Sequence, residues 1–104
     1  MEDALKKRLE EIIASKRVFL FMKGTPEAPQ CGFSNAVIEI LRQRNADFGS
    51  FDVLSDENVR QGVKEYGNWP TIPQLYVDGK LVGGCDIIKE MNDSGDLEKT
   101  LNPS

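Results

Sequence analysis

The sequence predicts an α/β fold in which helices flank a mixed four-stranded sheet, and three observations support this prediction. Two short apolar segments, at 17–22 and 48–53, are separated by a helical pattern that follows Cys31. Strands that are joined through a helix usually run parallel, so these two segments should lie parallel in one sheet. Asp78-Gly79, between two further short segments, is typical of a hairpin turn and adds an antiparallel pair.

The first half of the chain alternates between helical and strand patterns. An N-terminal amphipathic helix is predicted because four apolar residues recur at helical spacing: Leu5, Leu9, Ile12 and Ile13. The strand at 17–22 follows, and the loop at 23–30 is rich in Gly and Pro. After Cys31, helical spacing returns in three apolar residues: Val37, Ile40 and Leu41. This helix should end near Arg44, ahead of the strand at 48–53.

The second half begins with a helix start that holds a hydroxyl and two carboxylates: Ser55, Asp56 and Glu57. The inner face of that helix is formed by Val59, Val63 and Tyr66. The hairpin strands follow at 74–77 and 80–82. Asp86 could cap a further helix, whose inward face and C-terminal extension carry Ile87, Ile88, Met91, Leu97 and Leu101. The order α-β-α-β-α-β-β-α is a thioredoxin-like layout, and we expect residues 1–104 to form one domain.

Length and charge narrow the class of protein. The 104 residues carry a net charge of −4, whereas nucleic acids and anionic membranes favour basic patches, so neither is an expected partner. The longest apolar run, at 18–22, is too short to cross a membrane. The acidic start at Met1 is unlike a signal or transit peptide, and two distant Cys residues do not form a disulfide framework. We therefore expect a reducing compartment, the cytoplasm and also the nucleus.

The most informative segment is Cys31-Gly32-Phe33-Ser34, where the proline-rich loop turns into a helix. A thiol at a helix N-terminus meets unpaired backbone N–H groups and the positive end of the helix dipole, which favour the thiolate. Lys23, eight residues upstream, could add a positive charge. Ser34 stands where a Cys-x-x-Cys pair has its second Cys, so Cys31 must find a second sulfur in another molecule. Because the sequence contains no His, a Cys–His dyad and a His-ligated metal site are excluded.

Lys23, Arg60 and Ile72 are candidate contacts for a small peptide. Both cations could anchor carboxylates, and an Arg can bind one through two parallel hydrogen bonds. Ile72 is held extended by the ring of Pro73, so its backbone could pair with an extended peptide.

Gly83-Gly84 and the two residues that follow offer further contacts. The glycines permit close approach of a ligand, and the N–H groups of Cys85 and Asp86 open a helix that could receive a carboxylate. The Asp86 side chain could pair with an α-amino group. Together with the two cations, these features suit a zwitterionic peptide with two carboxylates and a central sulfur, and glutathione fits this description.

The same residues have plainer structural alternatives. Cys31 could be a buried structural Cys, Lys23 a solvated loop residue, and Arg60 a surface residue of its helix. Trp69 is expected to pack beneath the loop that follows it rather than to touch a ligand. For Cys85, packing as a small apolar residue is the simplest role.

Three motifs, in this order along the chain, carry a family resemblance. They are Lys23-Gly-Thr-Pro-x-x-Pro-x-Cys31-Gly-Phe-Ser34, Trp69-Pro-Thr-Ile-Pro73-Gln-Leu-Tyr and Gly83-Gly84-Cys85-Asp86. Together they resemble the monothiol (CGFS-type) glutaredoxins over residues 5–91. The stretches 51–57 and 59–62 further resemble the C-terminal modules of multidomain members. The resemblance implies that glutathione is bound by Lys23, Arg60, Ile72, Cys85 and Asp86, and that the peptide bond before Pro73 is cis.

Two functions of different classes follow from the resemblance. In the first, two chains each contribute Cys31 and two glutathione molecules contribute the other thiolates of a labile [2Fe–2S] cluster, which needs four. Such a homodimer would serve in iron–sulfur cluster transfer or iron sensing, with BolA-like proteins and iron–sulfur client proteins as partners. In the second, Cys31 removes glutathione from protein mixed disulfides as a thiol–disulfide oxidoreductase. In the family, the inserted loop at 23–30 is the explanation for weak reductase activity, which favours the first function.

A conditional disulfide between Cys31 and Cys85 is an alternative role for the second Cys. It resembles one proposed for some family members. Such a bond requires Cα atoms within about 7 Å of each other.

Overall fold

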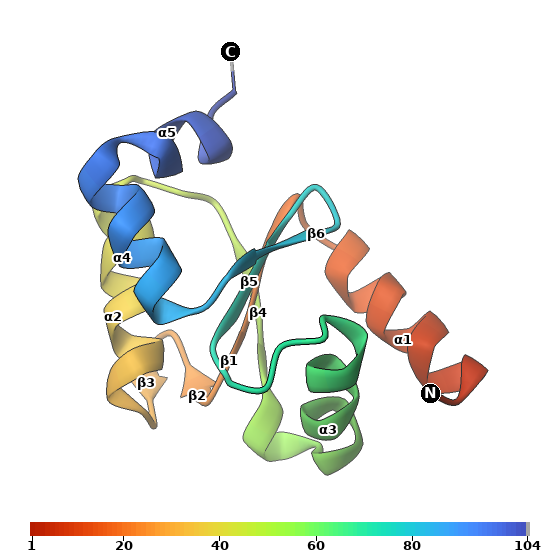
Figure 1. Ribbon diagram of the computed structural model, residues 1–104. Helices are drawn as coiled ribbons and strands as arrows, with labels where there is room; N and C mark the ends of the chain where they lie inside the picture. The colour runs from red at the N-terminus through yellow and green to blue at the C-terminus, as the bar shows by residue number, and fades with distance from the viewer. Residues whose placement is uncertain (104) are drawn as a thin grey trace.

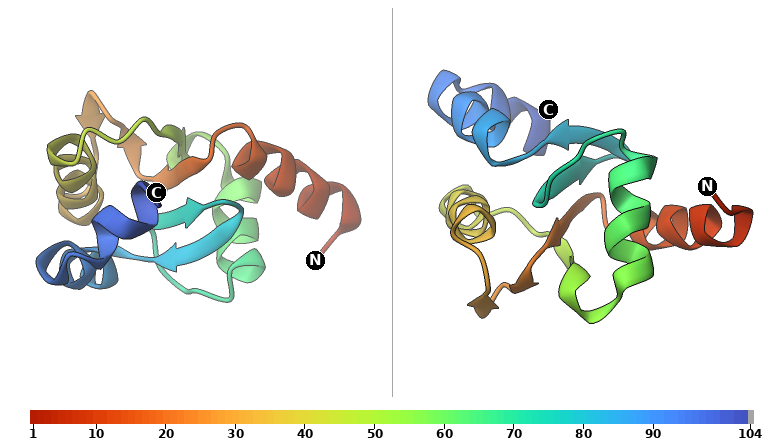
Figure 2. Two further views of the ribbon diagram at one scale, coloured as in Figure 1. Left: turned by 90° about the horizontal axis from the view of Figure 1, so that it is seen from above. Right: turned by 60° about the horizontal axis from the view of Figure 1, so that its bottom comes forward.

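A four-stranded sheet in the order β4-β1-β5-β6 forms the centre of the computed structural model, which describes residues 1–103. The strands are Gly49–Asp52 (β4), Val18–Met22 (β1), Gln74–Val77 (β5) and Lys80–Gly83 (β6). On one side of the sheet lie α1 (Asp3–Ala14) and α3 (Glu57–Tyr66), and on the other lie α2 (Gly32–Gln43), α4 (Cys85–Ser94) and α5 (Asp96–Leu101) (Figure 1). The views in Figure 2 show the same three layers.

Strand directions follow the sequence prediction. β1 pairs with β4 in parallel and with β5 antiparallel, and β5 pairs antiparallel with β6. The sheet is therefore mixed, and the thioredoxin-like layout is confirmed. A register shift between Leu75 and Tyr76 interrupts the β5–β6 pairing.

β1 is the centre of the core, and all five of its residues are buried. Side chains alternate across a strand, so Leu20 and Met22 pack with the hydrophobic residues of α2 and α4. Phe19 and Phe21 pack on the other face, with those of α1 and α3. This burial on both faces explains why the strand reads as an unbroken apolar run.

The loop at 23–30, which the sequence predicts to be ordered, contains regular structure that the sequence does not indicate. It holds a short hairpin of β2 (Gly24–Thr25) and β3 (Ala28–Pro29). Gly24 has φ +88°, and a Cβ there would lie 2.5 Å from the Ala28 carbonyl oxygen, so this position requires glycine.

One predicted boundary was wrong in detail. The strand predicted at 48–53 ends at Asp52, and Val53–Ser55 form the 3₁₀ turn η1 because the Asp52 carboxylate accepts the N–H of Leu54. The cap of α3 is Asp56, whose Oδ1 accepts the N–H of Val59 at 3.1 Å.

The capping role predicted for Asp86 was also wrong. Gly84 precedes α4, and Asp86 lies inside the first helical turn with an exposed side chain. Near the C-terminus, Gly95 with φ +90° separates α4 from α5, so the predicted terminal helix is a distinct element.

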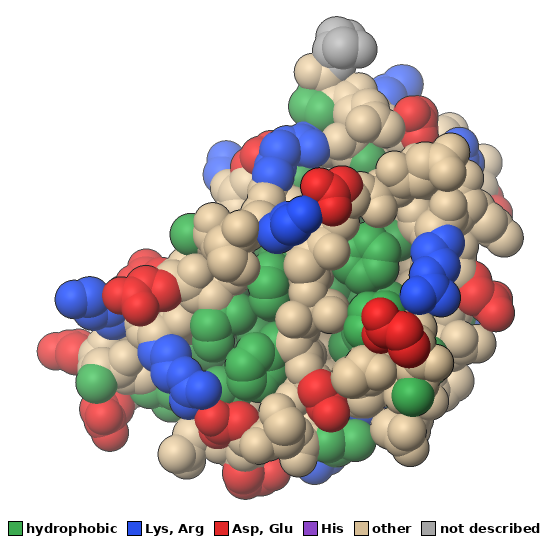
Figure 3. Space-filling model, turned by 180° about the vertical axis from the view of Figure 1, so that it is seen from behind, with side chains coloured by type: hydrophobic (Ala, Val, Ile, Leu, Met, Phe, Trp, Pro, Cys, Tyr) green, Lys and Arg blue, Asp and Glu red, His purple; other side chains and the backbone are tan. Residues whose placement is uncertain are grey.

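The surface seen from behind carries charges of both signs. In Figure 3, basic and acidic side chains are interspersed around apolar areas on this face. Across residues 1–103, no helix has the length and apolar character needed to cross a membrane.

Candidate thiol and peptide-binding site

Cys31 lies at the start of α2, where the β2–β3 hairpin meets the helix. Its backbone is extended (φ −154°, ψ 136°), and its carbonyl accepts the first helical hydrogen bond, from the N–H of Asn35 at 2.9 Å. The side chain is partly exposed, and a Cβ at Gly32 would meet only open space. The sulfur is therefore accessible at the N-terminus of the helix.

The surroundings lower the pKa of the Cys31 thiol. Desolvation is the largest single influence and raises the pKa, but the other influences together outweigh it. They are the backbone N–H groups of Ser34 and Phe33, the positive charge of Lys23 and the Ser34 hydroxyl. Because the thiolate is the nucleophilic and metal-binding form of Cys, the site favours the reactive state.

This lowered pKa predicts the pH dependence of Cys31 alkylation. Only the thiolate reacts with iodoacetamide, so the rate should rise with pH through a midpoint below the ordinary thiol range. Lys23→Ala removes a charge that stabilises the thiolate and should move the midpoint to higher pH. The measurement is mass spectrometry of the Cys31 peptide after timed reaction at a series of pH values, with the exposed Lys80→Ala as control. An unperturbed midpoint in the starting protein would contradict the assignment.

Ser34 is fully buried, and its hydroxyl contacts the backbone of the residue that precedes the β2–β3 hairpin. Its Oγ accepts a hydrogen bond from the N–H of Lys23 at 3.1 Å. The position that would hold a second Cys therefore carries a structural hydroxyl in this chain. Sequence patterns gave no sign of this contact, because it joins residues on different elements.

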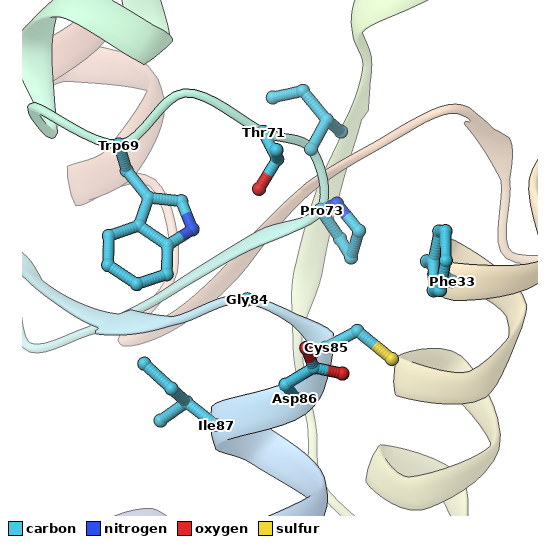
Figure 4. Close-up of a pocket in the computed structure, with 9 residues that line it drawn as sticks. Phe33, Trp69, Thr71, Pro73, Gly84, Cys85, Asp86 and Ile87 are labelled. Carbon is cyan, nitrogen blue, oxygen red and sulfur yellow. The ribbon is translucent and has the colours of Figure 1, made fainter.

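A pocket lies between the loop ahead of β5 and the start of α4. Its cavity is about 200 Å³, and it is lined by Phe33, Trp69, Thr71, Ile72, Pro73, Gly84, Cys85, Asp86 and Ile87. In Figure 4, Trp69 and Phe33 stand on opposite sides of the pocket, and the Cys85 sulfur points toward Phe33. Phe33 is 61% exposed, although it is large and apolar. The rim of the pocket thus reaches the helical turn that carries Cys31.

The Trp69 indole forms part of the pocket wall (Figure 4). A Cβ at Gly84 would lie 3.2 Å from the Trp69 Nε1 and 3.2 Å from the Pro73 carbonyl oxygen. Glycine at this position therefore lets the start of α4 approach the loop closely. The Trp69 Nε1 is buried and has no hydrogen-bond partner among the described residues.

Gln74 holds the loop that forms one wall of the pocket. This side chain is fully buried, and its Nε2 donates to the carbonyls of Trp69 (3.0 Å) and Thr71 (3.3 Å). Its Oε1 accepts the hydroxyl proton of Tyr76 at 3.0 Å, and burial raises the pKa of Tyr76 to about 12. The peptide bond between Ile72 and Pro73 in this loop is cis, as the family resemblance implies.

We predict that Gln74→Leu lowers the free energy of unfolding by about 2–4 kcal/mol, because it leaves buried carbonyl and hydroxyl groups without partners. Tyr76→Phe removes one of these hydrogen bonds and should cost about 0.5–1.5 kcal/mol. Urea denaturation followed by circular dichroism measures both changes. Equal losses of unfolding free energy in the two variants would show that the hydrogen bonds from Gln74 to the loop do not stabilise the fold.

The structure divides the sequence-predicted binding residues into three groups. Ile72, Cys85 and Asp86 line the pocket. Lys23 lies outside the pocket wall but acts electrostatically on Cys31. Arg60 belongs to neither group: it lies on α3, where its Nη1 is 3.9 Å from Glu57 Oε2.

Both Cys residues are free thiols, but their surroundings differ. Cys85 is 7% exposed and belongs to the hydrophobic cluster between the sheet and the α2–α4 layer. This agrees with the packing role expected from the sequence. Cys31 is the more accessible of the two sulfurs.

Comparison with known proteins identifies the family. The glutaredoxin family model matches residues 18–82. Monothiol glutaredoxin-S11 of Oryza sativa is 59% identical over 97 residues, which are 93% of this chain and 20% of that protein. An uncharacterized monothiol glutaredoxin of Synechocystis, described as ycf64-like, is 48% identical over 101 residues, 97% of this chain and 94% of that protein. The chain thus spans about a fifth of the rice relative and nearly all of the cyanobacterial one.

Solved structures share the same fold. Reduced poplar apo GrxS14 has a TM-score of 0.84 and 50% identity, covering 95% of this chain and 91% of that chain. Buckwheat glutaredoxin in complex with glutathione has a TM-score of 0.85 over 96% of this chain and 89% of that chain, but at 19% identity it shows the fold alone. With its Cys31-Gly32-Phe33-Ser34 site and these relatives, the chain belongs to the glutaredoxin family, among the monothiol glutaredoxins.

Proposed function

We propose that this chain binds glutathione and a labile [2Fe–2S] cluster held between two copies, and that it acts in iron–sulfur cluster transfer or iron sensing. The observation that carries the proposal is the local environment of Cys31. This thiol is accessible and favoured as thiolate, while the position that could supply a second local sulfur holds the buried Ser34 hydroxyl. One chain therefore presents one accessible cysteine thiol.

The site can supply one of the four thiolate ligands of such a cluster. A [2Fe–2S] cluster of this type takes four thiolates, so two chains and two glutathione molecules would complete the set. Cys31 has the thiolate character that an iron ligand needs, whereas Cys85 is buried in the core. When bound, the cluster would be the cargo of the protein, and the exchangeable glutathione ligands would make it labile.

The pocket supplies a place for part of the peptide. At about 200 Å³ it is smaller than the roughly 300–1,000 Å³ typical of sites that enclose a whole ligand, so the rest of glutathione would lie toward Cys31. We assign the Ile72 backbone to the extended peptide, the N–H groups of Cys85 and Asp86 to a carboxylate, and the Asp86 carboxylate to the α-amino group.

Lys23 and Arg60 are the two cations that could bind the other carboxylate of glutathione. Lys23 acts electrostatically on Cys31 and is the stronger candidate. Arg60 is assigned on the family pattern, because its side chain is about one third exposed and holds its nearest carboxylate only at 3.9 Å.

The proposal also covers the partners of the protein and its location in the cell. BolA-like proteins and iron–sulfur client proteins are the partners that the family suggests, and the cytoplasm, with the nucleus, is the proposed location. Residues 1–104 would act as one glutaredoxin domain.

A glutathione-dependent oxidoreductase is the second candidate, and the lowered pKa of Cys31 favours it. The Cys31 thiolate would attack the glutathione sulfur of a protein mixed disulfide and release the protein thiolate. The thiolate of a second glutathione would then attack the Cys31–glutathione disulfide, forming glutathione disulfide and restoring the Cys31 thiolate.

Anaerobic reconstitution with iron, sulfide and glutathione tests the proposal. We predict that the apo protein is a monomer at micromolar concentration and becomes a dimer with one iron per chain, because cluster and glutathione supply the bridge. Sedimentation gives the mass, and colorimetric assay gives the iron content. A mixed-disulfide reductase assay on the same samples tests the second candidate. A stable apo dimer that is unchanged on reconstitution would contradict the bridged arrangement.

A further inference from the structure

The backbone at Lys23 and Gly24 is held by hydrogen bonds from three separate parts of the chain. The N–H of Lys23 donates to Ser34 Oγ on α2 at 3.1 Å. The Lys23 carbonyl accepts the N–H of Gln30, just ahead of α2, at 2.9 Å. The N–H of Gly24 donates to Asp52 Oδ1, at the end of β4, at 2.9 Å.

These contacts engage the backbone of Lys23 and not its side chain. Gly24 at φ +88° lies against the Ala28 carbonyl, which further limits the path of the backbone. The Ser34 side chain is fully buried, so its contact does not compete with bulk water. The origin of the Lys23 side chain is thereby fixed relative to the helical turn that carries Cys31.

We propose that Ser34 and Asp52 are positioning residues, which hold the Lys23 backbone so that its ammonium group stays beside Cys31 and the bound peptide. This inference rests on the proposed function where it concerns the peptide. Neither Ser34 nor Asp52 needs to touch glutathione for this role. Lys23 is the residue through which both act.

Asp52 offers the cleaner test, because Ser34 also acts directly on the Cys31 thiol through its N–H and hydroxyl groups. Asp52→Ala removes the acceptor for Gly24 and should move the alkylation midpoint of Cys31 to higher pH, in the direction of Lys23→Ala. Asp52→Asn keeps an amide oxygen as acceptor and should behave like the starting protein. An upward shift as large in Asp52→Asn as in Asp52→Ala would overturn the positioning role, because the acceptor oxygen that Asn keeps would then make no difference. Loss of the carboxylate charge alone would move the midpoint to lower pH.

A double-mutant cycle tests whether the effect passes through Lys23. In a Lys23→Ala background, Asp52→Ala should produce no further shift, since residues that act through one group are not additive. The same shift in both backgrounds would overturn the proposal. Ser34→Ala should keep a residual shift in that background, because its hydroxyl also stabilises the Cys31 thiolate directly. Ser94→Ala is the matched control. Ser94 lies on α4, away from the site, and its Oγ also accepts a backbone N–H, that of Asp96.

Amide hydrogen exchange in the unmodified apo protein gives a measurement that needs no variant. The N–H groups of Lys23 and Gly24 should exchange at least about tenfold more slowly than in an unstructured chain, and Ser34→Ala should speed Lys23 exchange about five- to tenfold, the equilibrium change of one typical net hydrogen bond. Unprotected amides at both positions would overturn the proposal. These readouts use neither glutathione nor iron, so a protein that binds no cluster could still support the positioning role, and the two proposals fail separately.

Discussion

Replacing Cys31 with Ser should abolish cluster assembly and leave the fold intact. Cys31 is the accessible cysteine thiol of the chain, and a hydroxyl does not replace a thiolate as an iron ligand. Ser is among the preferred residues at a helix N-cap, so α2 should be at least as stable as before. The measurements are visible absorption and iron content after anaerobic reconstitution, together with circular dichroism of the apo variant.

Cys85→Ser is the matched control for this experiment. Its side chain is buried in the core, so the variant should still assemble a cluster, with at most reduced stability. Complete loss of the cluster in Cys85→Ser would mean that its role is more than packing. Retention of the visible bands in Cys31→Ser would remove Cys31 from the ligand set.

Lys23→Ala should weaken glutathione-dependent assembly about ten- to a hundredfold before discounting for solvent screening. A charge-assisted contact with a carboxylate contributes about 1.5–3 kcal/mol, which gives this range, and the partial exposure of Lys23 places the expected effect at its lower end. The experiment is anaerobic reconstitution across a glutathione titration, followed as iron bound per chain. The curve of the variant should move to higher glutathione and reach a similar plateau, because the iron ligands are unchanged.

Two outcomes would count against this assignment. Superimposable curves for the variant and the starting protein would remove Lys23 from the binding site. Full assembly without glutathione or another added thiol would overturn the borrowed-ligand arrangement. Lys80→Ala, on the exposed part of β6, controls for a general loss of positive charge.

The fold was predictable because its signals are local. Helical spacing, the buried run of β1 and the Asp78-Gly79 turn each depend on neighbours in the sequence. The Cys31 site was also predictable, since a loop-to-helix transition is visible in residue types alone. The parallel direction of β1 and β4 then followed from the helix that connects them. The pairing of β1 with β5 was seen only in the structure.

The supporting contacts of the site were not predictable, because they join distant residues. In the sequence, Ser34 indicates only that a second Cys is absent. In the structure, its hydroxyl accepts the N–H of Lys23. Asp52 reads as part of a strand, yet it ends β4 and accepts the N–H of Gly24. Trp69 forms part of the pocket wall, and Gly84, between β6 and α4, lets the chain approach it closely. No spacing rule relates these pairs.

The size of the pocket beside α2 has a consequence for the residence time of glutathione in the proposed complex. A cavity of about 200 Å³ encloses only part of a tripeptide, so few of its contacts oppose dissociation. The thiolate of a recipient protein could then replace glutathione one metal–sulfur bond at a time, without any rearrangement of the sheet and helices.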